Sequence, residues 1–120
     1  MNRILFYGGG NIAQAIISGL LSSGLNKNSI FYIDRNKANQ LKLKKLGIKK
    51  YVASDDAIDL VILCVKPKDA LDAYKAIAQN ISKPKVISLV AGIGSRKYLS
   101  ISKDVKLITN KFIHSSIHTC

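Results

Sequence analysis

The stretch from Arg3 to Gly24 restricts the possible folds more than any other part of the chain. An apolar run of strand-forming residues at 4–7 is followed by three consecutive glycines, and an apolar helical pattern begins at Asn11. This order predicts a strand, a tight turn and a helix.

The turn has the spacing Gly8-x-Gly10-x-x-Ala13, in which each small residue has a separate physical role. Gly8 allows a sharp turn, Gly10 leaves room for a phosphate to approach the backbone, and Ala13 lets the helix pack closely on the strand. The first turn of a helix also has free N–H groups and a partial positive charge. The spacing predicts a dinucleotide pyrophosphate site, and the alternative is a flexible turn between two buried elements. The predicted binding residues here are Gly8, Gly9, Gly10, Asn11, Ile12 and Ala13.

A second sign of a dinucleotide site is an acidic residue about 20 residues further along the chain. Asp34 meets this expectation at the end of a second apolar segment, 29–34, and Arg35 follows it. A carboxylate at this point accepts a hydrogen bond from a free ribose 2′-OH, whereas an arginine pairs with a 2′-phosphate. Both residues are therefore predicted to bind the adenosine ribose, and the two favour different cofactors.

The rest of the chain alternates between strand and helix patterns. The first helix, 11–25, begins with Asn11 as a candidate N-cap and is apolar on nearly all sides, so we expect it to be well buried. We predict further helices at 36–46, 69–80 and 95–101, strands at 48–53, 60–65, 85–91 and 104–108, and a turn at 54–56. This alternation predicts an α/β fold of the Rossmann type, a doubly wound parallel sheet in a three-layer α/β/α arrangement.

Ligands of such sheets bind beyond the carboxyl ends of the strands. The residues that follow the predicted strands should therefore line the same crevice as the glycine turn. They add Val65, Lys66, Pro67, Ala91 and Gly92 to the predicted cofactor-binding residues.

The length and composition limit the function classes. A chain of 120 residues suits one domain, and its net charge of +12 raises the question of nucleic-acid binding. In the segment 41–46, however, lysines alternate with leucines as on the wet face of an amphipathic helix, and no aromatic residues are interleaved for base stacking. No continuous apolar run reaches the roughly 18 to 20 residues of a membrane span. We expect a cytoplasmic protein with no nucleic-acid or membrane partner.

Cysteine and histidine residues give no metal signature. Cys64 lies inside an apolar run and is expected to be a core residue. His114, His118 and Cys120 have helical spacing near the end of the chain, but no acidic partner accompanies them. We predict no metal site.

Taken together, these segments resemble the nucleotide-binding domain of pyrroline-5-carboxylate reductases. The glycine fingerprint is shared by many dehydrogenases, whereas its combination with a Val-Lys-Pro strand end and a Ser-x-x-Ala-Gly-Ile segment is more specific. The segments that carry the resemblance are 7–13, 15–21, 34–36, 63–67 and 86–93.

The resemblance implies hydride transfer from a reduced nicotinamide cofactor to the C=N bond of pyrroline-5-carboxylate. It implies NADPH more than NADH, with Arg35 beside the ribose or its 2′-phosphate. It places Val65, Lys66 and Pro67 at the nicotinamide side and Ala91 with Gly92 at the crevice floor. No catalytic residue is assigned, because Lys66 has no partner in the sequence that would tune its pKa.

The resemblance ends near Asn110. We expect a cofactor-binding domain at residues 1–110 and a divergent tail at 111–120, without the helical second domain that carries the dimer contacts and the imine pocket in this family. The expectation is a truncated reductase with weak or no turnover, which needs a second domain to bind the small imine and forms a homo-oligomer through exposed sheet surface. A stand-alone nucleotide-binding or regulatory module and an oxidoreductase with another substrate remain alternatives.

Overall fold

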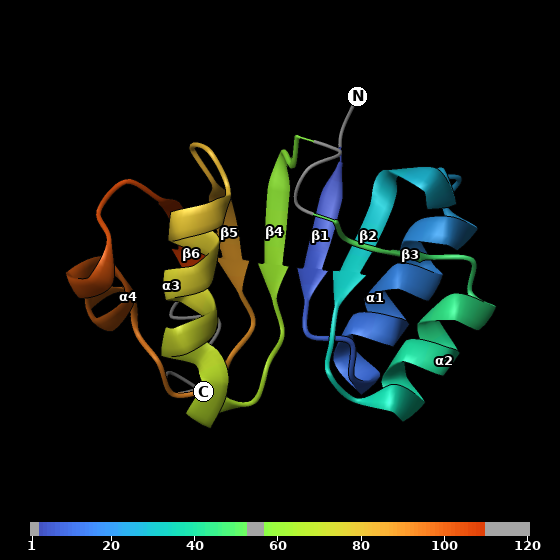
Figure 1. Cartoon of the computed structure of the whole chain (residues 1–120), viewed down its shortest axis with the longest axis horizontal. Helices are drawn as coiled ribbons and strands as arrows, with labels where there is room; N and C mark the ends of the chain where they lie inside the picture. Colours follow the sequence, from blue (N-terminus) through green and yellow to red (C-terminus); the bar gives the residue numbers. More distant parts are fainter. Residues whose placement is uncertain (1–2, 53–56, 110–120) are drawn as a thin grey trace, which may run out of the picture.

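The computed structural model describes residues 3–52 and 57–109, which form one six-stranded sheet with helices on both faces (Figure 1). All neighbouring strands pair in parallel, in the order β3-β2-β1-β4-β5-β6. The strands are β1 (Ile4–Tyr7), β2 (Ile30–Ile33), β3 (Lys49–Lys50), β4 (Leu60–Leu63), β5 (Lys85–Ser88) and β6 (Lys106–Thr109). The chain winds from β1 out to β3 and then returns to β4, so the order of winding reverses between β1 and β4. The predicted doubly wound parallel sheet is confirmed.

Helices α1 (Asn11–Ser22) and α2 (Lys37–Lys45) supply buried residues to the core on one face of the sheet. Helices α3 (Ala70–Asn80) and α4 (Ser95–Ile101) do so on the other face. We call these faces the α1 face and the α3 face. Two short 3-10 helices, η1 (Lys27–Ser29) and η2 (Pro67–Asp69), lie in connecting segments. The three-layer α/β/α arrangement is therefore also confirmed.

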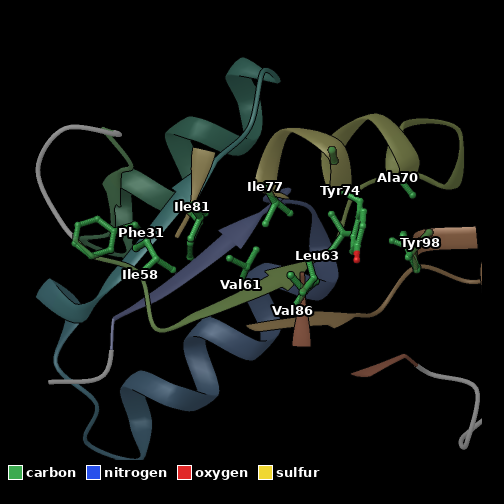
Figure 2. Packing of buried hydrophobic residues seen from close by; sticks show 14 residues of the cluster. Phe31, Ile58, Val61, Leu63, Ala70, Tyr74, Ile77, Ile81, Val86 and Tyr98 are labelled. Atoms are coloured by element: carbon green, nitrogen blue, oxygen red, sulfur yellow. The ribbon is translucent and has the colours of Figure 1, made fainter. Parts of the chain in front are cut away.

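Successive side chains along each strand point to opposite faces of the sheet. Val61, Leu63 and Val86 point toward α3, where Tyr74 and Tyr98 pack with ring centroids 4.9 Å apart (Figure 2). The α1-face core is built by Phe6, Ile62, Leu43 and other residues that lie outside the α3-face cluster.

Two predictions about α1 are wrong. The N-cap is Gly10 and Asn11 is the first helical residue, so the helix begins directly after the glycine turn. The helix is also less buried than expected: Ala13 and Ile17 are buried, whereas Ile12 is 59% exposed. Ile16, Leu20 and Leu21 are partly buried and pack against the α1-face core, so α1 is covered on one side only.

The other elements overlap the predicted ranges, although β5 ends at Ser88 and not at residue 91. Asn36 caps α2 by accepting a hydrogen bond from the Asn39 N–H at 3.0 Å, and α4 has the predicted bounds. The third strand is much shorter than the predicted 48–53. The turn predicted at 54–56 and the tail at 110–120, with its histidines and Cys120, lie outside the described residues. In the described segments no helix has the length and apolar character that crossing a membrane requires.

Candidate functional site

A cavity of about 600 Å³ lies where the carboxyl ends of β1, β2 and β4 meet the start of α3. Cavities of this size are typical of small-molecule and cofactor sites, and the place is the crevice at which open α/β sheets bind ligands. Its lining residues are Tyr7, Gly8, Gly9, Gly10, Ile33, Asp34, Arg35, Asn36, Asn39, Cys64, Val65, Lys66, Lys68, Asp69, Asp72 and Ala73.

Gly8 follows β1 directly and ties it to the end of β2. Its N–H donates to the Ile33 carbonyl at 2.8 Å, and its φ of +103° is a conformation that side chains with a Cβ rarely adopt. A Cβ at this position would also lie 2.7 Å from the carbonyl carbon of Cys64, which is main chain and cannot rotate away. The sharp turn predicted for this glycine is therefore fixed by both conformation and space.

Gly9 is held through both of its main-chain polar groups. Its N–H donates to Asp34 Oδ2 at 2.7 Å, and its carbonyl accepts from Gln14 Nε2 at 2.8 Å. The first bond ties the loop to the end of β2, and the second ties it to α1. The loop is therefore ordered by the protein itself, before any ligand is bound.

Asp34 accepts three hydrogen bonds from the protein. Besides the Gly9 N–H, its Oδ1 accepts from the Asn36 N–H at 2.7 Å and its Oδ2 accepts from Asn39 Nδ2 at 3.0 Å. A carboxylate has about four accepting positions, so one remains, on Oδ1. The sequence predicted a ribose-binding acid here; the structure shows a carboxylate that joins the glycine loop to α2.

Gly10 is the N-cap of α1 and offers no side chain to the first turn. Helix geometry leaves the first N–H groups without intrahelical partners and places the positive end of the helix dipole there. No other atom of the described residues lies within 4 Å of the position that a Cβ of Gly10 would take. The start of α1 is therefore open to solvent beside the cavity, and a helix N-terminus of this kind can accept an anion.

The cavity wall carries charges of both signs. The cations are Arg35, Lys66 and Lys68, and the anions are Asp34, Asp69 and Asp72. Cys64 also lines the cavity, and its burial raises the pKa of its thiol to about 12, so the thiol is neutral near pH 7. Among residues 3–52 and 57–109, no three potential metal ligands gather.

The structure brings together part of the predicted set. Seven of the predicted binding residues line the cavity: Gly8, Gly9, Gly10, Asp34, Arg35, Val65 and Lys66. Six do not: Asn11, Ile12, Ala13, Pro67, Ala91 and Gly92. The first three belong to α1, where Ala13 is fully buried against the sheet, and Pro67 begins η2.

Ala91 and Gly92 are exposed in the loop after β5. The cavity lies at the ends of β1, β2 and β4, and residues of η2 and α3 form part of its wall. The sequence analysis missed Asn39, Lys68, Asp69 and Asp72. Asn39 lies three residues after Asn36, the N-cap of α2. An N-cap side chain accepts a hydrogen bond from the N–H at this position, so this spacing was the signal for Asn39 in the sequence.

Fold, glycine loop and cavity define a dinucleotide-binding domain of the Rossmann type. The family model described as "NADP oxidoreductase coenzyme F420-dependent" matches residues 3–92, and the chain belongs to this family.

Within this class the chain is similar to pyrroline-5-carboxylate reductases. It is 38% identical over 101 residues to the enzyme of Staphylococcus epidermidis, a match that covers 76% of this chain and 36% of the relative. The structure of the Coxiella burnetii reductase superposes with a TM-score of 0.78 and 26% identity, over 90% of this chain and 43% of that one. The Plasmodium falciparum pyrroline carboxylate reductase, solved with NADP bound, shares the fold with a TM-score of 0.67 and 22% identity, over 83% of this chain and 37% of that one. The chain thus spans little more than a third of the length of the curated relatives it matches.

Proposed function

We propose that the cavity binds a nicotinamide dinucleotide, with the pyrophosphate at the start of α1. One observation carries this proposal: the loop Gly8–Gly10 is held in place by Asp34 directly before an open helix N-terminus at the cavity wall. A preformed backbone site of this kind binds an anion without having to order a flexible loop first. The NADP in the related Plasmodium structure supports the choice of ligand.

The reaction that we propose is the one named by the relatives, reduction of pyrroline-5-carboxylate. Hydride would pass from the reduced nicotinamide to the imine carbon, and the imine nitrogen would take a proton, giving proline. Such a transfer needs the imine held close to the nicotinamide. The residues of this chain supply the cofactor side, and the imine pocket is proposed to need a second domain.

We propose further that the preferred cofactor is NADPH. Arg35 lies at the cavity wall and can pair with a 2′-phosphate, while Asp34 has only one accepting position left for a 2′-OH. The three N–H donors around Asp34 also offset its negative charge, which would otherwise repel a phosphate. Most accepting positions of the Asp34 carboxylate, the group that favours NADH, are therefore used by hydrogen bonds within the protein.

The remaining sequence expectations enter the proposal as follows. Asn11, Ile12 and Ala13 would contribute main-chain N–H groups, and Val65, Lys66 and Pro67 would border the cofactor. Residues 1–110 would be the cofactor domain and 111–120 a separate tail, in a cytoplasmic protein.

The first test is a fluorescence titration of the whole chain with NADPH, comparing Gly10→Asp with Gly94→Asp. Both glycines are helix N-caps, and at neither would a Cβ meet another described atom within 4 Å, so both variants should fold. Gly10→Asp puts a carboxylate in the anion site and should abolish binding, whereas Gly94→Asp should bind as the wild type does. Equal affinities in all three proteins, or no binding by the folded wild type, would overturn the proposal.

The second test separates Arg35 from Asp34. Arg35→Ala should weaken NADPH binding by about ten- to a hundredfold, the loss expected for hydrogen bonds to a charged group, and should leave NADH binding nearly unchanged. Asp34→Ala releases the Gly9 N–H and should weaken both cofactors together. A loss confined to NADH in Asp34→Ala would show a direct ribose contact and contradict the NADPH preference.

A further inference from the structure

A row of apolar residues crosses the α1 face of the sheet and becomes more exposed along its length. The strand register aligns Phe6 with Ile62, Ile62 with Ile87, and Ile87 with Ile108. Phe6 is fully buried and Ile62 is 8% exposed, whereas Ile87 is partly exposed and Ile108 is 63% exposed. Within residues 3–52 and 57–109, the layer that covers this face therefore ends near β4.

The opposite face shows no such trend as far as β5. Leu5, Val61 and Val86 form the neighbouring row, and each is at most 1% exposed. Leu107 continues this row on β6 and packs against the α3-face core. Ile87 and Ile108, by contrast, are outside both core clusters that the described residues form. Apolar residues on a central sheet without a covering layer mark a surface that another element occupies.

Two cations lie beside these isoleucines. Lys85 pairs with Lys106 in the register, and both precede an isoleucine by two residues, so they share its side of the sheet. Both lysines are exposed. We call the surface formed by Lys85, Ile87, Lys106 and Ile108 the open sheet face.

We propose that the open sheet face docks an amphipathic helix with an apolar stripe and an acidic flank, supplied by a second polypeptide. A helix is the element that already covers the same face over β1, where α1 packs, so a docked helix would extend the existing layer and its core. The two lysines select a helix whose flank is negatively charged.

Charge disfavours the other occupants. A second copy of this chain would bring a further net charge of +12 to a surface bordered by lysines. The sequence 110–120 contains no Asp or Glu, so it lacks the acidic flank. A separate acidic helix is therefore the best match.

The test uses two synthetic helical peptides of about 18 residues, long enough to form several turns. Both carry the same Leu/Ala stripe, one with Glu and one with Lys along the flank. Fluorescence anisotropy with the 120-residue chain should show binding of the Glu peptide at least about tenfold tighter than that of the Lys peptide, as expected for complementary charges.

Three variants locate the binding surface. Ile108→Asp should abolish Glu-peptide binding, and the double variant Lys85→Glu with Lys106→Glu should reverse the preference between the peptides. Leu41→Asp is the matched control, because Leu41 on α2 is 61% exposed, nearly as much as Ile108, and lies away from β5 and β6. It should leave peptide binding unchanged.

The proposal is overturned if the two peptides bind equally, if Leu41→Asp weakens binding as much as Ile108→Asp, or if sedimentation shows a dimer that Ile108→Asp dissociates while neither peptide binds. Circular dichroism of each variant confirms that it is folded. The experiment contains no cofactor, so its result is independent of the proposed dinucleotide site.

Discussion

The crevice at the carboxyl ends of the strands has two differently built ends. At the β1 and β2 end, the Gly8 N–H donates to the Ile33 carbonyl at 2.8 Å and the Gly9 N–H donates to Asp34 at 2.7 Å, and all four residues line the cavity. At the β5 end, Ala91 and Gly92 are exposed and do not line it. The glycine loop and Asp34 are held by hydrogen bonds within the chain while the first N–H groups of α1 stay open, so this end of the crevice is ordered without a ligand.

The β5 strand itself is nevertheless firmly held. Its last residue, Ser88, is fully buried, shares a hydrogen bond of 2.8 Å with the hydroxyl of Tyr98 and accepts one from the Val90 N–H at 3.3 Å. The contrast therefore begins beyond Val90. A firmly held strand end is therefore not enough to form a cavity wall; among the described residues, the β1 and β2 end combines both features.

The largest effect on stability is expected at the β1 and β2 end of the crevice, from Gly8→Ala. The added Cβ would meet the main chain of Cys64 and Val65, and the positive φ adds strain, so we expect a loss of about 3 kcal/mol or more in unfolding free energy. Denaturant unfolding measures this loss, and NADPH binding should disappear with it.

The matched control is Gly19→Ala in α1, where the Cβ would meet none of the described atoms within 4 Å. Here the gain in helix propensity should raise stability by about 0.5–1 kcal/mol. Similar losses in both variants would show that the turn at Gly8 is not specially constrained.

A smaller effect is expected for Tyr98→Phe. Removing the hydroxyl leaves the buried Ser88 Oγ without this partner, which should cost about 1–2 kcal/mol of unfolding free energy. NADPH affinity should stay the same, because Tyr98 supports the sheet and not the cavity.

Tyr32→Phe is the control for this change. Tyr32 is also largely buried, and its hydroxyl makes no hydrogen bond within the described segments, so stability should change by less than about 0.5 kcal/mol. A fall in NADPH affinity in Tyr98→Phe alone would show that the two ends of the crevice are coupled.

The smallest effect is expected for Gly92→Ala. Its φ of +81° should cost about 1 kcal/mol, and the space around it is open as far as the described atoms extend. NADPH affinity should be unchanged if the β5 loop stands outside the site, as the cavity indicates. A weaker NADPH affinity in a variant that is still folded would place Gly92 at the cofactor. The two ends of the crevice would then differ less than the cavity indicates.

The sequence predicted most of the sheet because local patterns and strand order carry that information. The glycine turn, Asp34 and the helix after Pro67 were found from spacing alone. The hydrogen bond that Asp34 accepts from the Gly9 N–H could not be predicted, because a carboxylate that holds the loop and one that binds a ribose occupy the same position in a sequence. The burial of α1 was also overestimated, since an apolar helix pattern shows what prefers to be covered and not whether a partner is present.

The exposed isoleucines of the open sheet face also have a calorimetric consequence. Apolar surface that is already in water when the chain is folded adds nothing to the heat capacity of unfolding, so this increment for the chain alone should fall below the usual value of about 12–15 cal/mol/K per residue. Any element that covers Ile87 and Ile108 should then bind with a negative heat-capacity change, which grows with the apolar area removed from water. The temperature dependence of the binding enthalpy would thus measure how much of this layer a partner completes.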